Sequence, residues 1–308
     1  MNILVIKLGA VGDVVLAFQA FADIRGHHPD ARVTLLTTAP FAALFAGSPW
    51  FDDIVVDARP RWWDVLGILR LRRELRGFGL VYDLQTSGRS GAYYRLAGRP
   101  AWSGIARGAS LPHANPVRNE MHTVERQRDQ LMMAGVPPGP RADLAWLISG
   151  GPRVDGPYAV LVPGAAPHRP AKRWPAQRFG QLAASLAGRG VRPVVVGGPG
   201  EVRLAAEILA ECPSALDLVG QTTLADLAGL AARATLAVGN DTGPMHVAAA
   251  VGCPSLVLFS AESDPALTAP CGPGGVPAAV LRVPDLAALP LDRVAAALPW
   301  GHTVRPAK

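Results

Sequence analysis

Short apolar runs alternate with helix-like stretches along most of the chain, and this alternation limits the fold more than any other feature. In the first half, strands are expected at 2–7, 32–37, 53–56 and 80–84, and helices at 13–26, 40–46, 64–76, 90–96 and 122–134. In the second half, strands are expected at 158–162, 192–196, 216–219, 236–238 and 255–259, and helices at 175–189, 201–211, 224–232 and 243–251. Strands that alternate with helices build a parallel sheet with helices on both faces, so the sequence predicts an α/β protein.

The pattern stops and restarts once, near the middle of the chain. Residues 136–140 and 149–157 are rich in glycine and proline, which mark turns and domain boundaries. We therefore expect two domains, residues 1–150 and residues 151–308, with the C-terminal segment left open to pack back on the first. Two such domains imply a cleft between them, with ligands at the carboxyl ends of the strands.

Composition narrows the class of partner. Of the 308 residues, 49% are hydrophobic and 18% charged, and the formal net charge is +6, which favours acidic partners. The arginines are dispersed, without the aromatic-interleaved basic run typical of nucleic-acid binding, so no nucleic-acid partner is expected. The scattered histidines and three cysteines predict no metal site. Polar residues soon interrupt the apolar N-terminus, so a cytoplasmic protein with at most peripheral membrane contact is expected.

The first candidate site is the turn Lys7–Asp13, between an expected strand and an expected helix. Its two glycines permit a tight loop, but the spacing is not that of a dinucleotide fingerprint. Asp13 fits two interpretations. It either caps the helix or is a carboxylate held at the cleft as a general base.

A second candidate is the loop 162–175, which follows the first strand of the second domain and ends at a proline suited to the first position of a helix. Lys172 offers a point charge to a phosphate group. Arg173 fits equally well as a solvated charge at the rim, and Trp174 is expected to pack rather than to stack on a ligand.

Two further turns lie in the second domain. Glu201 stands near a helix start, where it either accepts hydrogen bonds from a ribose or interacts favourably with the helix dipole. In the turn 239–246, Asp241 or Thr242 can cap the next helix, and Gly243 lets the backbone approach a ligand. A strand, a polar turn and a helix N-terminus together favour an anion, which suggests a phosphate-bearing ligand. His246 either faces the substrate or is packed.

Taken together, Lys7-x-x-x-x-Gly12-Asp13, the segment 170–175 and Asp241-Thr-Gly-Pro-x-His246 resemble the ADP-heptose:lipopolysaccharide heptosyltransferases of glycosyltransferase family 9. The motifs follow the family's order and the resemblance covers essentially the whole chain. It implies a GT-B architecture, in which two Rossmann-like domains with parallel sheets face a central cleft. The first domain would bind the acceptor and the second the nucleotide sugar. It also implies transfer with inversion, without a metal or a cofactor.

The resemblance also implies roles for individual residues. Asp13 matches the catalytic base, and Lys172 the lysine that contacts the donor phosphates. The remaining donor-binding residues are the ribose-binding acid Glu201, Thr222 beside the adenine, and the turn residues Asp241, Thr242, Gly243 and His246. Gln19 departs from the pattern, since a proline is common at its position in relatives.

The acceptor half matches the family least. Four arginines are candidate clamps for acidic sugars or phosphate groups: Arg59, Arg61, Arg89 and Arg107. The basic segment 64–76, with Leu66 and Leu69, fits either an anionic membrane surface or an ordinary amphipathic helix.

The sequence thus favours an inverting enzyme that moves heptose from ADP-heptose to an acidic glycolipid of the lipopolysaccharide inner core, at the inner face of the inner membrane. Three alternatives stay open: a relative with another nucleotide sugar or acceptor, a nucleotide-sugar epimerase, and a non-catalytic binding protein. Acceptor-dependent release of nucleotide would separate the transferase from the epimerase.

Overall fold

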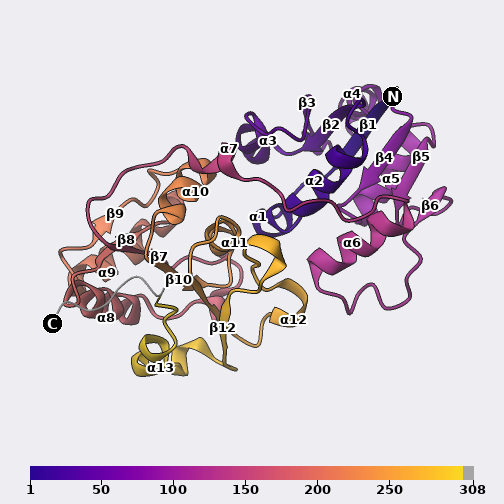
Figure 1. Cartoon of the computed structure of the whole chain (residues 1–308). Coiled ribbons are helices and arrows are strands. Elements are labelled where there is room, and N and C mark those ends of the chain that lie inside the picture. The colour runs from indigo at the N-terminus through magenta and orange to yellow at the C-terminus, as the bar shows by residue number, and fades with distance from the viewer. Residues whose placement is uncertain (301–308) are drawn as a thin grey trace. The chain divides into compact units, whose positions relative to one another are not determined.

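The computed structural model describes residues 1–300, and these form two compact units (Figure 1). The first unit comprises Met1–Trp146, and the second begins at Leu147. Each unit has its own parallel sheet, so the chain has the α/β architecture that the alternating pattern predicts.

The sheet of the first unit has six strands in the described residues, all parallel, in the order β3-β2-β1-β4-β5-β6. The strands are β1 (Asn2–Ile6), β2 (Arg32–Thr37), β3 (Asp53–Val56), β4 (Leu80–Asp83), β5 (Ala101–Gly104) and β6 (Leu111–Pro112). The connecting helices are α1 (Val11–Val15), α2 (Phe18–His27), α3 (Ala39–Phe45), α4 (Val65–Glu74), α5 (Gly88–Leu96) and α6 (Thr123–Met133). This is the strand order of the dinucleotide-binding Rossmann fold.

The second unit repeats this topology. Its six strands within residues 147–300 have the order β9-β8-β7-β10-β11-β12, again all parallel. The strands are β7 (Tyr158–Val162), β8 (Arg192–Val195), β9 (Leu216–Asp217), β10 (Leu236–Asn240), β11 (Ser255–Phe259) and β12 (Ala279–Arg282). The helices are α7 (Ala145–Ile148), which spans the boundary, α8 (Ala176–Ala187), α9 (Val202–Glu211), α10 (Leu224–Ala232), α11 (Gly243–Ala250), α12 (Pro265–Thr268) and α13 (Leu291–Ala296), with short 3-10 turns at Pro170–Lys172, Pro199–Glu201, Pro273–Gly275 and Leu286–Ala288.

The central strands are apolar throughout because helices cover both faces of each sheet. Ile3, Leu4, Val5 and Ile6 of β1 are all fully buried. In β7, every residue from Tyr158 to Val162 is buried. A strand buried on both faces loses the alternation of polar and apolar residues, which explains these continuous runs. The functional turns that follow β1 and β7 are therefore anchored in the most buried part of each unit.

The structure differs from the sequence-based expectations at several elements. The single helix expected at 13–26 is two helices, α1 and α2. The strands β5, β6 and β12 were not predicted. The strands β5 and β6 lack the apolar run that identifies a buried strand, whereas β12 has a short apolar run at residues 279–281 and is partly exposed.

Described residues near the C-terminus belong to the core of the second unit. Leu286, Leu289, Val294 and Leu298 are buried with Phe179 and Leu182 of α8. From the sequence, packing of this segment on the first domain was one expectation. Up to residue 300, the buried apolar residues of the segment pack in the core of the second unit. The tail 301–308 lies outside the described residues.

Gln19 has a structural role that explains its departure from the family pattern. Its amide Nε2 donates to Asp23 Oδ1 at 2.8 Å and to the carbonyl of Pro140 at 2.9 Å, and its Oε1 accepts from the N–H of Ala142. A proline at position 19 would have no side-chain amide. In this chain, the amide of Gln19 connects α2 by hydrogen bonds to the segment after α6.

Candidate active site

The site residues of both units follow the strands at which the sheet order reverses. In the first sheet this switch point lies between β1 and β4, and in the second between β7 and β10. Loops at the carboxyl ends of two such strands diverge in opposite directions, which leaves a crevice for a ligand. Lys7–Asp13 follows β1, and Asp241–His246 follows β10. Both predicted turns therefore lie where this fold binds ligands.

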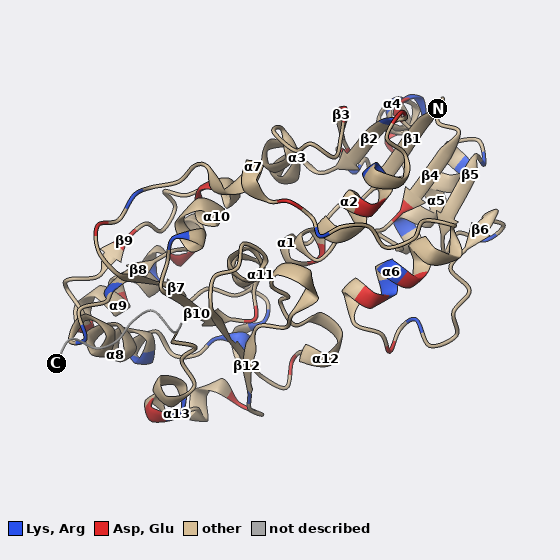
Figure 2. Cartoon of the chain, viewed as in Figure 1, with Lys and Arg blue, Asp and Glu red and all other residues tan. Residues whose placement is uncertain are grey.

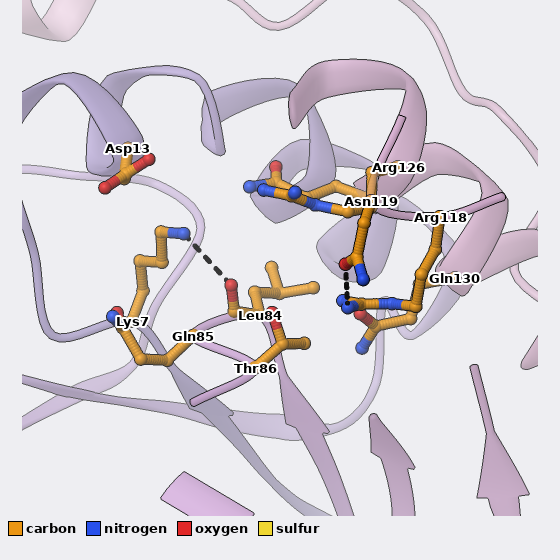
Figure 3. Close-up of a pocket in the computed structure, with 10 residues that line it drawn as sticks. Lys7, Asp13, Leu84, Gln85, Thr86, Arg118, Asn119, Arg126 and Gln130 are labelled. Carbon is orange, nitrogen blue, oxygen red and sulfur yellow. Dashed lines mark hydrogen bonds between the residues drawn. The ribbon is translucent and has the colours of Figure 1, made fainter. Parts of the chain in front are cut away.

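A polar pocket opens at the switch point of the first unit (Figure 3). Its volume is about 220 Å³. The lining residues come from the turns after β1 and β4, from the segment before α6 and from α6 itself: Lys7, Asp13, Leu84, Gln85, Thr86, Arg118, Asn119, Arg126, Gln127 and Gln130. Three of these side chains are cationic and one is a carboxylate. The pocket therefore suits an anion that also presents a hydroxyl group.

Asp13 supplies that carboxylate. It is the third residue of α1 rather than its cap, since the N-cap position is Ala10, whose N–H donates to Asp13 Oδ2 at 3.2 Å. Of the two expected interpretations of Asp13, the structure therefore rules out the helix cap. One oxygen of Asp13 holds the turn, and the side chain lines the pocket.

Lys7 lies beneath Asp13 and is almost fully buried. Its ammonium donates to the carbonyl of Leu84 at 3.0 Å, which ties the turn after β1 to the turn after β4. Burial lowers the pKa of Lys7 to about 8, although the carboxylates of Asp13 and Asp83 oppose this effect. Lys7 is therefore mainly charged at neutral pH and stands close to the carboxylate of the proposed base.

The turn after β4 is shaped by Asp83, which is fully buried. Its Oδ1 accepts from the N–H groups of Gln85 and Thr86 at 3.1 and 2.9 Å. Thr86 has φ +43, which is rare for a β-branched residue and requires such support. Burial raises the pKa of Asp83 to about 6. Asp83 therefore organises the pocket floor without facing the pocket.

Arg118 is held in the pocket by a buried network. Its Nε donates to His113 Nδ1 at 3.3 Å, and its Nη1 donates to Asn119 Oδ1 at 2.9 Å. His113 Nε2 lies 2.8 Å from Asp129 Oδ2, which also accepts from Asn115 Nδ2 at 2.8 Å. The remaining Nη2 of Arg118 is buried without a hydrogen-bond partner in the described structure. A buried donor of this kind is costly, and an anionic ligand would satisfy it.

Of the four expected acceptor arginines, one contacts the turn after β1. Arg59 Nη2 donates to the carbonyl of Leu8 at 3.1 Å. Arg89 Nη1 lies 3.3 Å from the carbonyl of Pro60 and from the hydroxyl of Tyr93. Arg61 is exposed, with its guanidinium carbon 5.2 Å from the ring centre of Trp63, and Arg107 is exposed after β5. The structure places none of the four among the residues lining the pocket.

In the second unit, Lys172 and Asp241 form an ion pair. The Lys172 ammonium donates to Asp241 Oδ2 at 2.5 Å, and the Ser263 hydroxyl donates to the same oxygen at 2.6 Å. Both partners of the ion pair are largely buried, with side-chain exposures of 12% and 8%. The expected phosphate-binding lysine and the first acidic residue of the expected donor-site turn therefore meet directly, and Asp241 fixes the position of the Lys172 charge.

Asn240, at the end of β10, holds the loop that carries Lys172. Its Oδ1 accepts from the N–H of Trp174 at 2.9 Å, and its Nδ2 donates to the carbonyl of Pro163 at 2.8 Å. Trp174 is buried, and its ring meets Phe179 edge-on with centres 4.9 Å apart, so the expectation that it packs is confirmed. Arg173 is half-buried and donates to the carbonyl of Ala165, so it is not the solvated rim charge considered above.

Glu201 lies against the beginning of the same loop. Its carboxylate accepts from the N–H of Gly198 at 2.5 Å. A Cβ at Gly164 or Gly197 would lie within 2.5 Å of a Glu201 oxygen, so a side chain at either position would displace the carboxylate from its present place. Thr222 lies in the turn before α10, which is joined to the Gly197 turn by the bond from Gly220 N–H to the Gly197 carbonyl at 2.8 Å. These turns meet at the carboxyl ends of β7, β8 and β9.

The expected capping of α11 is confirmed in position and not in bonding. Thr242 occupies the N-cap position, but its side chain makes no capping hydrogen bond, and the carboxylate of Asp241 is engaged by Lys172 and Ser263. Gly243 is the first residue of α11. His246 is buried, with 5% exposure, so it is packed in this structure.

Sequence reasoning missed several residues of these sites. Arg118, Arg126 and Gln85 line the pocket, and Asn240 and Ser263 hold the donor loop and Asp241. Asn240 could have been recognised from the sequence, because an asparagine at the end of a buried strand needs hydrogen-bond partners for its side-chain amide. Within residues 1–300, no three His, Cys, Asp or Glu side chains are grouped to hold a metal ion.

Comparison with known proteins agrees with this architecture. The family model for glycosyltransferase family 9 (heptosyltransferase) matches residues 68–280. The chain is 27% identical over 295 residues to lipopolysaccharide heptosyltransferase 1 of Pseudomonas aeruginosa, covering 88% of this chain and 82% of the relative. It is 26% identical over 302 residues to lipopolysaccharide heptosyltransferase 2 of Salmonella typhimurium, covering 88% and 85%.

Solved structures show the same fold. A glycosyltransferase family 9 protein from Veillonella parvula superposes with a TM-score of 0.80 at 22% identity, covering 96% of this chain and 95% of that chain. The E. coli heptosyltransferase WaaC with ADP gives a TM-score of 0.79 at 23% identity, covering 96% and 98%.

Two parallel sheets of the same strand order have the GT-B fold, and together with the family match they define a glycosyltransferase. The chain belongs to glycosyltransferase family 9, the heptosyltransferase family.

Proposed function

We propose that this glycosyltransferase moves a heptose from ADP-heptose to a hydroxyl group of an acidic acceptor in the lipopolysaccharide inner core, with inversion and without a metal. Family membership supports the class of reaction. The observation that carries the acceptor half is the pocket after β1, where the Asp13 carboxylate stands beside the cations of Lys7, Arg118 and Arg126. An acidic sugar needs both features, since its anion must be held while its hydroxyl loses a proton.

In the proposed reaction, Asp13 accepts the proton of the acceptor hydroxyl as the oxygen attacks C1 of the donor sugar. The bond from C1 to the diphosphate oxygen breaks with oxocarbenium character, and ADP leaves with the electron pair. The new glycosidic bond forms on the opposite face of the sugar, which inverts the anomeric centre. Asp13 then returns its proton to solvent.

Lys172 stabilises the negative charge that develops on the leaving ADP. An ammonium group has three N–H donors, and Asp241 accepts from one of them, so others stay available to phosphate oxygens. The N–H of Gly243 at the beginning of α11, together with the helix dipole, adds a positive potential. We assign the ribose hydroxyls to Glu201, the adenine side to Thr222, and structural support of the donor turn to Thr242 and His246.

The donor assignment is tested by thermal shift with ADP, UDP, GDP, dTDP and NAD. Stabilisation by ADP above the other four is the expected result, because the proposal assigns the adenine side to Thr222 and the diphosphate to Lys172. Lys172→Met is expected to remove the shift, while Arg203→Met, an exposed cation on α9, is expected to keep it. Preference for another nucleotide would overturn ADP-heptose as the donor and leave the glycosyltransferase class intact.

Membrane contact and a location at the inner face of the inner membrane form part of the same proposal, since the expected acceptor is a glycolipid. None of the helices within residues 1–300 is long and apolar enough to cross a bilayer.

A further inference from the structure

An unusual concentration of exposed apolar side chains lies between β3 and the middle of α4. Trp62 and Trp63 are 53% and 74% exposed, and Val65, Leu66 and Leu69 are 66%, 68% and 52% exposed. Five large apolar side chains are thus open to solvent within eight consecutive residues of the first unit. Single exposed apolar residues are ordinary, but a contiguous group marks a surface that contacts something apolar.

The helix α4 shows that these residues are not simply the edge of the core. Its core-facing residue is Leu71, which is 5% exposed. At about 100° per residue, Leu66 and Leu69 lie about 60° apart, and each lies about 140° or more from Leu71. An ordinary amphipathic helix has one apolar face, directed at the core. The first half of α4 has a second apolar face, on the outside.

Charge on the same segment indicates the kind of partner. Residues 59–76 carry six arginines and two acidic residues. One of the acids, Asp64, caps α4 by accepting from the N–H of Gly67 at 2.9 Å. Arg70, Arg72, Arg73 and Arg76 are exposed, and none of them forms an ion pair with another described residue. Figure 2 shows the positively charged positions on the ribbon of α4.

We propose that Trp62, Trp63, Val65, Leu66 and Leu69, together with Arg70, Arg72, Arg73 and Arg76, form a docking surface for an anionic lipid bilayer. Tryptophan and leucine side chains enter the boundary between headgroups and acyl chains, while flanking arginines bind lipid phosphates. The surface is basic along its length, so a second copy of this chain would place like charges against each other. An anionic lipid layer complements both its charge and its apolar side chains.

The docking surface is joined to the candidate acceptor arginines. The guanidinium carbon of Arg89 lies 5.3 Å from the ring centre of Trp62, and that of Arg61 lies 5.2 Å from the ring centre of Trp63. The surface therefore deepens the proposed function, because a lipid-anchored acceptor would enter from the face that contacts the bilayer. The docking itself needs no turnover, so the two proposals can fail separately.

The test is co-sedimentation of the full chain with vesicles of phosphatidylcholine alone or with phosphatidylglycerol. Binding to the phosphatidylglycerol vesicles, weakened by added salt, is the expected result. Trp62→Ser with Trp63→Ser is expected to lower the partition coefficient at least about tenfold, and Arg70→Gln, Arg72→Gln with Arg73→Gln by a similar factor. The matched control, Val202→Ser with Val276→Ser, removes two exposed apolar side chains elsewhere and is expected to bind as the unaltered protein does.

Thermal unfolding and the ADP-induced shift confirm that each variant is folded. The proposal is overturned if the unaltered protein does not bind phosphatidylglycerol vesicles, or if the tryptophan and arginine variants bind as tightly as the control. Equal binding to both vesicle types would remove anionic lipid as the partner. A dimer that the tryptophan substitutions dissociate would assign the surface to a second copy instead. If the unaltered protein binds the vesicles and does not transfer a glycosyl group, the proposed function is overturned and the docking surface is not.

Discussion

Arg118 donates from Nε to Nδ1 of His113 at 3.3 Å, and this contact fixes the protonation of the imidazole. A guanidinium can only donate, so Nδ1 of His113 must be unprotonated. The ring proton then lies on Nε2, 2.8 Å from Asp129 Oδ2. His113 is therefore neutral in the state that holds Arg118 in the pocket. Protonation of His113 would put two cations in contact and break the bond.

The first prediction concerns acid pH and follows from this contact. Burial lowers the pKa of His113 below its ordinary 6.5, and Arg118 and Arg126 act in the same direction against the opposing effect of Asp129. As pH falls through 6.5, the unfolded chain binds a proton that the folded chain does not, so the free energy of unfolding decreases. Urea unfolding between pH 5.5 and 7.5 measures this slope. His113→Gln is expected to flatten it, whereas His168→Gln, at an exposed position, is expected to leave it unchanged. An equal slope in His113→Gln would contradict the assignment.

A second prediction concerns alkaline pH and Lys7. The pKa of Lys7 is lowered to about 8, against an ordinary value of 10.5. Above pH 8 the folded chain releases this proton before the unfolded chain does, so Lys7 makes the free energy of unfolding rise with pH between 8 and 10.5. The pocket loses a cation over the same range, so KM for an acidic acceptor is expected to increase. Lys7→Met should abolish the pH-dependent part of both effects. If Lys7→Met keeps the alkaline rise in KM, another group is responsible.

A third prediction separates the effect of the Lys172 charge from the effect of holding that charge in place. Asp241→Asn removes the carboxylate that holds Lys172, and Lys172→Met removes the charge itself. Because the pair is largely buried, each substitution is expected to lower the free energy of unfolding by about 1–3 kcal/mol. Lys172→Met is expected to weaken ADP binding more, since Asp241 acts only through the lysine. Calorimetric titration with ADP and a double-mutant cycle measure this coupling. Ser263→Ala, which leaves the ion pair intact, is the control, and additive effects of Asp241→Asn and Lys172→Met would contradict the coupling.

A fourth prediction concerns Asn240, which no ligand needs to touch. Asn240→Leu leaves the N–H of Trp174 and the carbonyl of Pro163 without their partners in a buried place. We expect a loss of about 2–4 kcal/mol in the free energy of unfolding, from two unsatisfied groups and a lost amide. ADP binding should weaken as well, because the loop carrying Lys172 loses its support. Asn2→Leu, at an exposed position of the first unit, serves as control. A stable Asn240→Leu variant with normal ADP affinity would show that the loop is held by other contacts.

The sequence predicted well the strands that contain a continuous apolar run, both in the centre of a sheet and, for β3, at its edge. The expected bounds of β2, β3, β7 and β11 agree with the structure, and each is a run of β-branched or aliphatic residues between polar turns. The short strands β5 and β6 could not be found in this way, because they lack a continuous apolar run and pair in the sheet through tertiary context. The edge strand β12 was missed although residues 279–281 form a short apolar run.

The turns that follow β1, β7 and β10 could also be predicted, because glycine, proline and acidic residues mark strand-to-helix connections. Their internal bonding could not. Asp241 and Thr242 both have good capping chemistry, and only the approach of Lys172 and Ser263, 69 and 22 residues away in sequence, shows that Asp241 has other partners. Arg118 was missed although its partner His113 is only five residues away, because the segment between β6 and α6 has no periodic pattern that shows this contact.

The central claim is that Asp13 removes the proton of an acceptor hydroxyl during heptosyl transfer. The most direct measurement is the rate of ADP release from ADP-heptose, with and without a lipopolysaccharide precursor that lacks heptose, for the unaltered chain, Asp13→Asn and the exposed control Asp155→Asn. We predict acceptor-dependent release for the unaltered chain and for Asp155→Asn. For Asp13→Asn we predict a kcat lower by about 10²–10⁴-fold, with the ADP-induced thermal shift retained. An Asp13→Asn enzyme that turns over at the rate of the unaltered chain would contradict the account.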